Sequence, residues 1–225
     1  VHIPMDASAL CAELHQDGFE VLQVASRAPH RDAYLRRPDW GRRLDASAAA
    51  SLAARRAQDA EAGHPPADLT VVIADGLSAV AAQRNAAATV RALRSALPTG
   101  LRIGPLVLAT QARVALGDEV GELLASRILL ILIGERPGLS SPDSLGAYLT
   151  YAPRVGRSDA ERNCVSNIRP EGLPPSAAAA RLAWLIEAAL RLRLTGVQLK
   201  DESDRPLLTG HSAPDALPRT QTFHP

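Results

Sequence analysis

The sequence has few aromatic residues and a single lysine. Its 225 residues include two tryptophans, three tyrosines and two phenylalanines, which leaves little for stacking on single-stranded bases. Lys200 is the one lysine among 25 basic residues, and 24 acidic residues balance them. Nucleic-acid-binding proteins generally carry a basic excess or a basic stripe. The composition therefore argues against a general nucleic-acid-binding function.

Long apolar runs are also missing. The longest, at residues 128–133, is far shorter than the roughly 20 residues that a membrane-spanning helix needs. The first 30 residues carry Asp6, Glu13, Asp17 and Glu20 and no apolar segment, so we expect neither a signal peptide nor a membrane span.

The two cysteines, Cys11 and Cys164, are far apart and follow no C-x-x-C pattern. They predict neither a disulfide framework nor a zinc site. A reducing, cytoplasmic compartment is the expectation that follows.

The familiar catalytic and nucleotide-binding signatures are absent. The sequence contains no G-x-G-x-x-G, no P-loop, no G-x-S-x-G and no H-E-x-x-H motif. Its six histidines lie at positions 2, 15, 30, 64, 211 and 224, outside the apparent core. This placement argues against a Ser-His-Asp triad built on that core.

What the sequence does contain is an alternation of strand and helix patterns. Apolar, β-branched runs predict strands at residues 69–74, 103–109, 128–133 and 147–152, with a last short strand at 197–199. Ala-rich or amphipathic segments predict helices at 45–62, 79–97, 117–125 and 174–194. Such alternation is typical of an α/β fold with a mostly parallel sheet flanked by helices.

Local signals set the expected boundaries of these elements. Ser78 is a candidate N-cap, Ser158 and Glu161 form a capping-box pattern, and Ser141-Pro142 has the pattern of an N-cap followed by N1. Gly196 is expected to end the last helix in the left-handed conformation.

Residues 1–33 mix weak helical and turn signals. We therefore expect three regions. These are a short N-terminal helical or connector region at 1–66, an α/β domain at 67–200 and an irregular tail at 201–225.

Three polar loops follow predicted strands. They are residues 75–78, the segment around Arg113 and Val114, and residues 134–138. Ligands of open parallel sheets bind beyond the carboxyl ends of the strands. Topology thus predicts a ligand over these loops.

Single residues in these loops allow two interpretations. Glu135 follows a buried strand, where a carboxylate accepts hydrogen bonds from a ligand or pairs with Arg136, Arg154 or Arg157; position alone favours the pair. Cys164 is by itself best read as a small buried apolar residue, and Asp75 as a turn or cap residue.

Four arginines surround a Pro-Asp-Trp-Gly turn at residues 36–43. Such a group is usually a solvated surface or a set of carboxylate partners. From the residues alone, the chain is predicted to be an α/β binding domain for an organic ligand without catalytic machinery of its own.

Five segments, in order, resemble the small (light) subunit family of ethanolamine ammonia-lyase. The two most specific are Gly-Glu-Arg-Pro-Gly at 134–138 and Arg-Asn-Cys-Val-Ser-Asn-Ile at 162–168, and the others are residues 34–44, 72–78 and 117–124. The resemblance covers roughly residues 34–200.

This resemblance implies a Rossmann-like sheet and a role in an adenosylcobalamin-dependent enzyme. In that family the large subunit, a TIM barrel, holds ethanolamine and the catalytic residues, and the cofactor lies between the two chains. The complex converts ethanolamine to acetaldehyde and ammonia through an adenosyl radical, and the cofactor carries the difficult chemistry. The resemblance also implies a higher-order hetero-oligomer, located either free in the cytoplasm or within a bacterial microcompartment.

Three positions match cobalamin-binding residues of the family: Val114, Glu135 and Cys164. The resemblance implies that Glu135 accepts hydrogen bonds from corrin amides and that Val114 and a neutral Cys164 thiol cover apolar parts of the cofactor. We expect no metal ligand from this chain and no thiolate bond from Cys164 to cobalt.

The chain also lacks an Asp-x-His-x-x-Gly motif and any histidine between residues 65 and 210. Base-on binding, with the cofactor's own benzimidazole on cobalt, is the expectation. The alternative functions are a stand-alone flavodoxin-like module for a nucleotide or flavin, and a nucleic-acid module that uses the arginines at 36–43.

Overall fold

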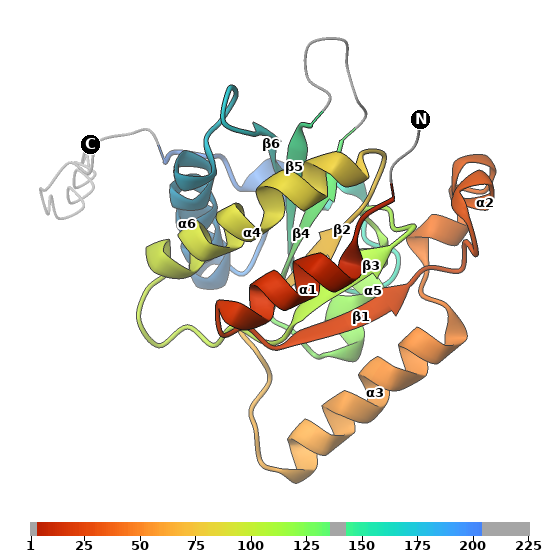
Figure 1. The fold of residues 1–225 in the computed structure, drawn as a ribbon. Coiled ribbons are helices and arrows are strands. Elements are labelled where there is room, and N and C mark those ends of the chain that lie inside the picture. Colours follow the sequence, from red (N-terminus) through yellow and green to blue (C-terminus); the bar gives the residue numbers. More distant parts are fainter. Residues whose placement is uncertain (1–3, 136–142, 204–225) are drawn as a thin grey trace, which may run out of the picture.

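A six-stranded mixed sheet forms the centre of the fold, with helices on both faces (Figure 1). The computed structural model describes residues 4–135 and 143–203. The strand order is β1-β3-β2-β4-β5-β6. The strands are β1 (Val21–Ala25), β2 (Leu69–Ala74), β3 (Leu106–Thr110), β4 (Ile128–Gly134), β5 (Leu145–Tyr151) and β6 (Asn163–Ile168).

Six α-helices and three short 3-10 turns complete the described part of the chain. The helices are α1 (Ala7–Gln16), α2 (Arg31–Arg36), α3 (Ala46–Glu61), α4 (Ala79–Ala96), α5 (Leu116–Leu123) and α6 (Pro175–Leu192). The 3-10 turns are η1 (Trp40–Arg42), η2 (Asp159–Glu161) and η3 (Gly196–Gln198).

Two apolar clusters hold these helices against the two faces of the sheet. On one face, Leu69, Val71 and Ile73 of β2 pack with residues of α1, α4 and α6. On the other face, Val72 and Ala74 pack with residues of α3 and α5. Every residue of β2 and β4 is buried, as expected for strands covered on both sides.

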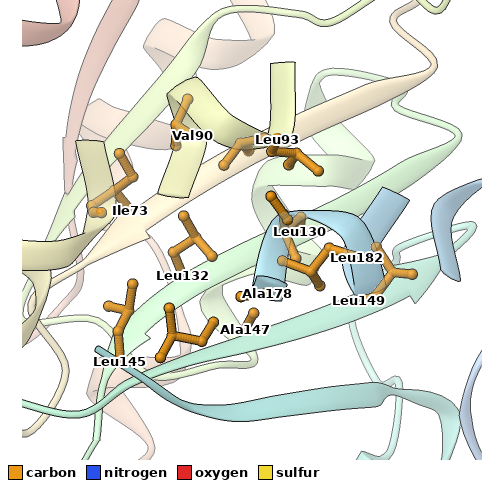
Figure 2. Packing of buried hydrophobic residues seen from close by; sticks show 14 of the residues in the cluster. Ile73, Val90, Leu93, Leu130, Leu132, Leu145, Ala147, Leu149, Ala178 and Leu182 are labelled. Atoms are coloured by element: carbon orange, nitrogen blue, oxygen red, sulfur yellow. The ribbon is translucent and has the colours of Figure 1, made fainter. Parts of the chain in front are cut away.

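The larger cluster carries most of the apolar burial. Figure 2 shows side chains of β2, β4 and β5 gathered with Val90 and Leu93 of α4 and Ala178 and Leu182 of α6. Each fully buried leucine or isoleucine contributes about 1.5–3 kcal/mol, so this face is the main source of stability.

The expectation of a mostly parallel sheet is wrong. β1, β3, β2 and β4 pair in parallel, but β5 is antiparallel to β4 and β6 is antiparallel to β5. The connections at residues 135–144 and 152–162 are too short to carry the crossover that a parallel return requires. Because the sheet is mixed, the Rossmann-like part of the prediction is not confirmed.

Most other element predictions are confirmed. α3, α4, α5, β2 and β4 lie within two residues of their expected bounds. The Ser78 hydroxyl caps α4 by accepting from the Ala81 N–H. The capping box is present, since the Ser158 N–H donates to Glu161 Oε2 at 2.7 Å.

Four local features differ from the sequence-based expectation. Residues 21–25 form β1 and residues 163–168 form β6, and neither strand was expected. Both are edge strands, and their side chains are only partly buried, so their hydrophobic patterns are weak. Residues 197–199 do not form a strand, because η3 occupies most of them. The residue in the left-handed conformation that ends α6 is Arg193 rather than Gly196. The expected cap at Ser141-Pro142 lies outside the described residues.

The first 66 residues are not only helical. α1 packs in the larger apolar cluster, and β1 joins the sheet beside β3. The division at residues 66 and 200 stays a prediction. Within residues 4–135 and 143–203, no helix combines the length and hydropathy that a membrane-spanning segment requires.

Candidate functional site

Asp75 ties together the loops that follow β2 and β3. Its carboxylate accepts hydrogen bonds from the backbone N–H groups of Gly76, Gln111 and Ala112, at 2.8, 2.9 and 3.1 Å. Asp75 is 4% exposed, and burial raises its pKa. These contacts make Asp75 a loop-fixing residue, in agreement with its interpretation as a turn residue.

Gly134 allows the loop after β2 to come into backbone contact with the end of β4. The Leu77 N–H donates to the Gly134 carbonyl at 2.9 Å. A Cβ on Gly134 would overlap the carbonyl oxygens of Ser78 and Asp75. Only glycine therefore allows this approach, which places Glu135 directly beside the loop after β2.

A cavity of about 380 Å³ opens at this end of the sheet. Its lining residues come from α2, from the loops after β2, β3 and β4, and from β5: Tyr34, Leu77, Arg113, Val114, Ile133, Gly134, Glu135 and Tyr148. Val114 and Glu135, two of the three predicted binding residues, thus face one space.

Glu135 is held by its neighbour Ser144. The Ser144 hydroxyl donates to Glu135 Oε2, and the Glu135 N–H donates to the Ser144 carbonyl at 3.0 Å. A Cβ on Gly146 would lie 2.7 Å from Glu135 Oε1, so glycine leaves room for the carboxylate. Among the described residues, Glu135 forms no ion pair with an arginine. The pair that position alone favoured is therefore not formed with Arg154 or Arg157, and Arg136 lies outside the described residues.

Cys164 reaches the same site through Tyr148. The two residues are directly opposite each other on β6 and β5, and each shifts the pKa of the other. Cys164 is exposed rather than buried, which contradicts the interpretation of this residue as a small buried one. The surrounding protein still removes enough water from the thiol to raise its pKa.

Tyr148 joins the three predicted residues into one site. Burial, followed by the neighbouring Cys164 and Glu135, raises the pKa of its hydroxyl. Tyr148 lies at the margin of the apolar cluster under α3 and α5. Sequence analysis did not single out this residue. The polar alternation of Tyr148 and Thr150 on β5 was the signal that could have found it.

A second cavity of about 670 Å³ adjoins the first. Arg113, Val114 and Tyr148 line both. The second cavity also receives Arg42 and Arg157, so its wall is markedly more basic.

Tyr34 anchors α2 over these cavities. Its buried ring lies between the guanidinium groups of Arg31 and Arg113, at 4.6 and 4.5 Å from the ring centroid. Arg31 also donates to the carbonyls of Gly76 and Leu77 at 2.7 and 3.1 Å. Sequence analysis missed these contacts, because they join residues far apart in the chain.

The arginines at 36–43 divide between local structure and cavity wall. Arg37 pairs with Asp39, and Arg43 donates twice to Glu119 of α5, both at 2.9 Å. Arg42 lines the second cavity. The prediction that this cluster includes carboxylate partners is confirmed for Arg37 and Arg43.

One polar atom at the site is left without a partner. Arg113 Nη2 donates to the Tyr34 carbonyl at 3.1 Å, but its Nε–H is buried and finds no acceptor in the described part of the chain. Leaving such a donor unpaired costs about 1–3 kcal/mol, which a ligand with a suitable acceptor would recover.

A further cavity, of about 550 Å³, opens at the opposite end of the sheet, beside Thr70 and Ile103. Its main charged groups already pair with one another, as Arg55 does with Glu20 and Asp59. The cavity at the carboxyl ends of the strands is therefore the better candidate.

Comparison with known proteins gives a consistent result. The family model for the ethanolamine ammonia-lyase light chain (EutC) matches residues 1–200. The chain is similar to the ethanolamine ammonia-lyase small subunit of Xanthomonas campestris pv. campestris, with 53% identity over 97% of this chain and 79% of the relative. It is also similar to the small subunits of Ralstonia nicotianae, with 51% identity over 92% and 76%, and of Azotobacter vinelandii, with 50% identity over 93% and 77%.

Proposed function

The chain belongs to the ethanolamine ammonia-lyase light-chain family, and from this premise we propose that it contributes to adenosylcobalamin binding in the complex. In the proposed reaction, ethanolamine gives acetaldehyde and ammonia. The large subunit holds the substrate and the catalytic residues. A cytoplasmic location, free or within a bacterial microcompartment, stays a prediction.

The observation that carries the proposal is the convergence of Val114, Glu135 and Cys164. Val114 and Glu135 line one cavity, and Cys164 is the cross-strand partner of Tyr148 in the wall of that cavity. These residues come from three separate segments, after β3, after β4 and on β6. The fold brings these segments to one end of the sheet, which is a reason for the three residues to act together.

The donor and acceptor set of the cavity fits a corrinoid. Cobalamin carries primary amides around its rim, and amides need both acceptors and donors. Glu135 Oε2 accepts one bond from Ser144, which leaves lone pairs on both oxygens for amide N–H groups. The unpartnered Arg113 Nε–H is a donor at the same place.

The remaining walls supply apolar cover. Val114, Leu77 and the Tyr148 ring present hydrocarbon surface to the cavity. Cys164 is proposed to contact the cofactor as a neutral thiol, because the raised pKa keeps the proton on sulfur at neutral pH. We do not propose Cys164 as a cobalt ligand. We still expect the cofactor to bind in the base-on form. The bound cofactor would supply the radical chemistry, while this chain positions it.

We expect Glu135→Gln to weaken cofactor retention by the complex about tenfold, because a carboxylate that accepts two amide bonds is replaced by an amide that accepts fewer. This chain would be co-expressed with the large subunit. The resulting complex would be mixed with adenosylcobalamin and gel-filtered. The visible spectrum of the protein peak reports the retained corrin.

Glu187→Gln, on the exposed surface of α6, is the matched control and should retain the cofactor normally. Normal retention by the Glu135 variant would remove Glu135 from the site. A wild-type complex that retains no corrin would refute the proposed function, and nucleotides and flavins would then be screened.

A further inference from the structure

The second cavity contains two arginines whose charge is not matched by a carboxylate. Arg42 is exposed at the end of η1, and among the described residues its side chain has no ion pair. Arg113 also has no acidic partner in the described ranges, and its Nε–H is buried and unpartnered. The Arg113 N–H donates to the Gly41 carbonyl at 2.8 Å, so the two arginines approach the cavity from adjoining backbone.

The other charged groups of this cavity are already occupied. Arg43 donates to Glu119. Arg157 pairs with Glu161 and donates to the Ala152 carbonyl.

The two carboxylates that face the cavity are Asp118 and Asp159. Asp118 is buried in a two-fold hydrogen bond with Arg162, at 2.6 and 2.7 Å. The Asp159 side chain is 97% exposed and lies 3.4 Å from Arg162. Arg42 and Arg113 therefore leave a local excess of positive charge.

The position of this excess narrows the choice of ligand. Val114 and Tyr148 line both cavities, so a molecule bound beside Glu135 continues directly into the arginine-lined space. Guanidinium groups match the oxygens of a phosphate in charge and geometry. Cobalamin carries one phosphate, the phosphodiester of its nucleotide loop, and in the base-on form this loop stays folded against the corrin.

We propose that Arg42 and Arg113 bind the phosphodiester of the cofactor's nucleotide loop. This inference rests on the proposed function and deepens it. The first cavity receives the corrin rim, and the second receives the nucleotide loop. Binding of the loop in this way would help to hold the cofactor in the base-on form.

The test compares two corrinoids that differ in the nucleotide loop. Cyanocobalamin carries the phosphodiester, whereas dicyanocobinamide lacks the whole loop. Equilibrium dialysis of each corrinoid against the complex of this chain and the large subunit gives its dissociation constant, and the measurement needs no enzyme turnover. Arg42→Gln should raise the dissociation constant of cyanocobalamin about tenfold, as expected for loss of a charge-assisted hydrogen bond. The same substitution should change the dissociation constant of dicyanocobinamide by less than about twofold.

Controls separate charge from structure. Arg42→Lys keeps the charge without the planar fork and should restore part of the affinity. Arg191→Gln removes an exposed arginine of α6 on the other face of the sheet and should change neither constant. Arg113→Gln should weaken cyanocobalamin binding more than dicyanocobinamide binding, because Arg113 lines both cavities. It should also lower thermal stability, because Arg113 stacks on Tyr34.

Equal weakening of both corrinoids by Arg42→Gln would overturn the phosphate assignment, and so would no change in either. If the wild-type complex binds neither corrinoid, the proposed function fails and this inference fails with it. Failure of the inference alone leaves wild-type binding of both corrinoids intact.

Discussion

At the scale of single residues, the site depends on side chains that are held in one protonation state. Tyr148 and Cys164 are cross-strand neighbours, and desolvation raises the pKa of both. Both therefore stay neutral near pH 7. A neutral thiol is a weak nucleophile and a poor metal ligand, which suits a residue proposed to cover a cofactor without bonding to its cobalt.

Cys164 should react with thiol reagents only at higher pH than free cysteine does. Its rate with iodoacetamide, measured in a Cys11→Ser background, should rise half-maximally above pH ~8.5, the ordinary value for a cysteine thiol. Tyr148→Phe should move the profile further upward, because the Tyr148 hydroxyl lowers the Cys164 pKa. A midpoint at or below that of free cysteine would contradict the neutral-thiol interpretation.

At the scale of secondary-structure elements, a buried ion pair joins α5 to the antiparallel edge of the sheet. Arg162 precedes β6 and donates to Asp118 of α5 and to Thr150 of β5. The Arg162 and Asp118 side chains are 2% and 1% exposed. Burial opposes the charge on Arg162, but its bonds to Asp118 outweigh this and raise the Arg162 pKa. The pair fixes the wall of the second cavity.

Arg162→Met should destabilise the chain by about 3–5 kcal/mol, because it leaves a buried carboxylate without its partner. The double variant Asp118→Leu/Arg162→Met should cost less than Arg162→Met alone, since it leaves no uncompensated charge. Urea unfolding of wild type, Asp118→Leu, Arg162→Met and the double variant gives the comparison. If the losses from the two single variants simply add in the double variant, the two side chains are not coupled as the geometry indicates.

At the scale of the whole molecule, carboxylates paired with arginines make stability sensitive to acid. Bonds from Arg55 lower the pKa of Glu20. Burial raises the pKa of Glu119, but bonds from Arg43 and the Leu44 N–H outweigh this and lower it. The Ser158 N–H, followed by Arg157, lowers the pKa of Glu161 to about 2. Asp75 acts in the opposite sense, since burial raises its pKa.

A carboxyl whose pKa is lower in the folded state stabilises the fold above its unfolded pKa, and this contribution disappears as pH falls through the folded value. For Glu161 the window runs from 4.5 down to about 2. We expect the urea midpoint to fall across this window and to fall less steeply in Glu161→Gln. Glu187→Gln, exposed on α6, should follow the wild-type curve. A Glu161→Gln curve parallel to wild type would exclude this contribution.

The sequence by itself determined the elements whose signals are local. Strands β2 and β4 follow from continuous apolar runs, and Ser78 marks the start of α4 because a capping side chain bonds its own helix. The position of Glu135 at the end of a buried strand also follows from the sequence, whereas Val114 and Cys164 as binding residues stay predictions from the family resemblance.

Only the tertiary structure decided the direction of β5 and β6, the place of β1 and the contacts at the site. Strand pairing joins residues far apart in the chain. An edge strand with a weak hydrophobic pattern, such as β1, is therefore recognised only from its pairing with β3. The pairing of Tyr148 with Cys164 and the unpartnered Arg113 Nε–H exist only once separate segments meet. Sequence patterns report local propensity, whereas the chemistry of this site depends on distances between non-local groups.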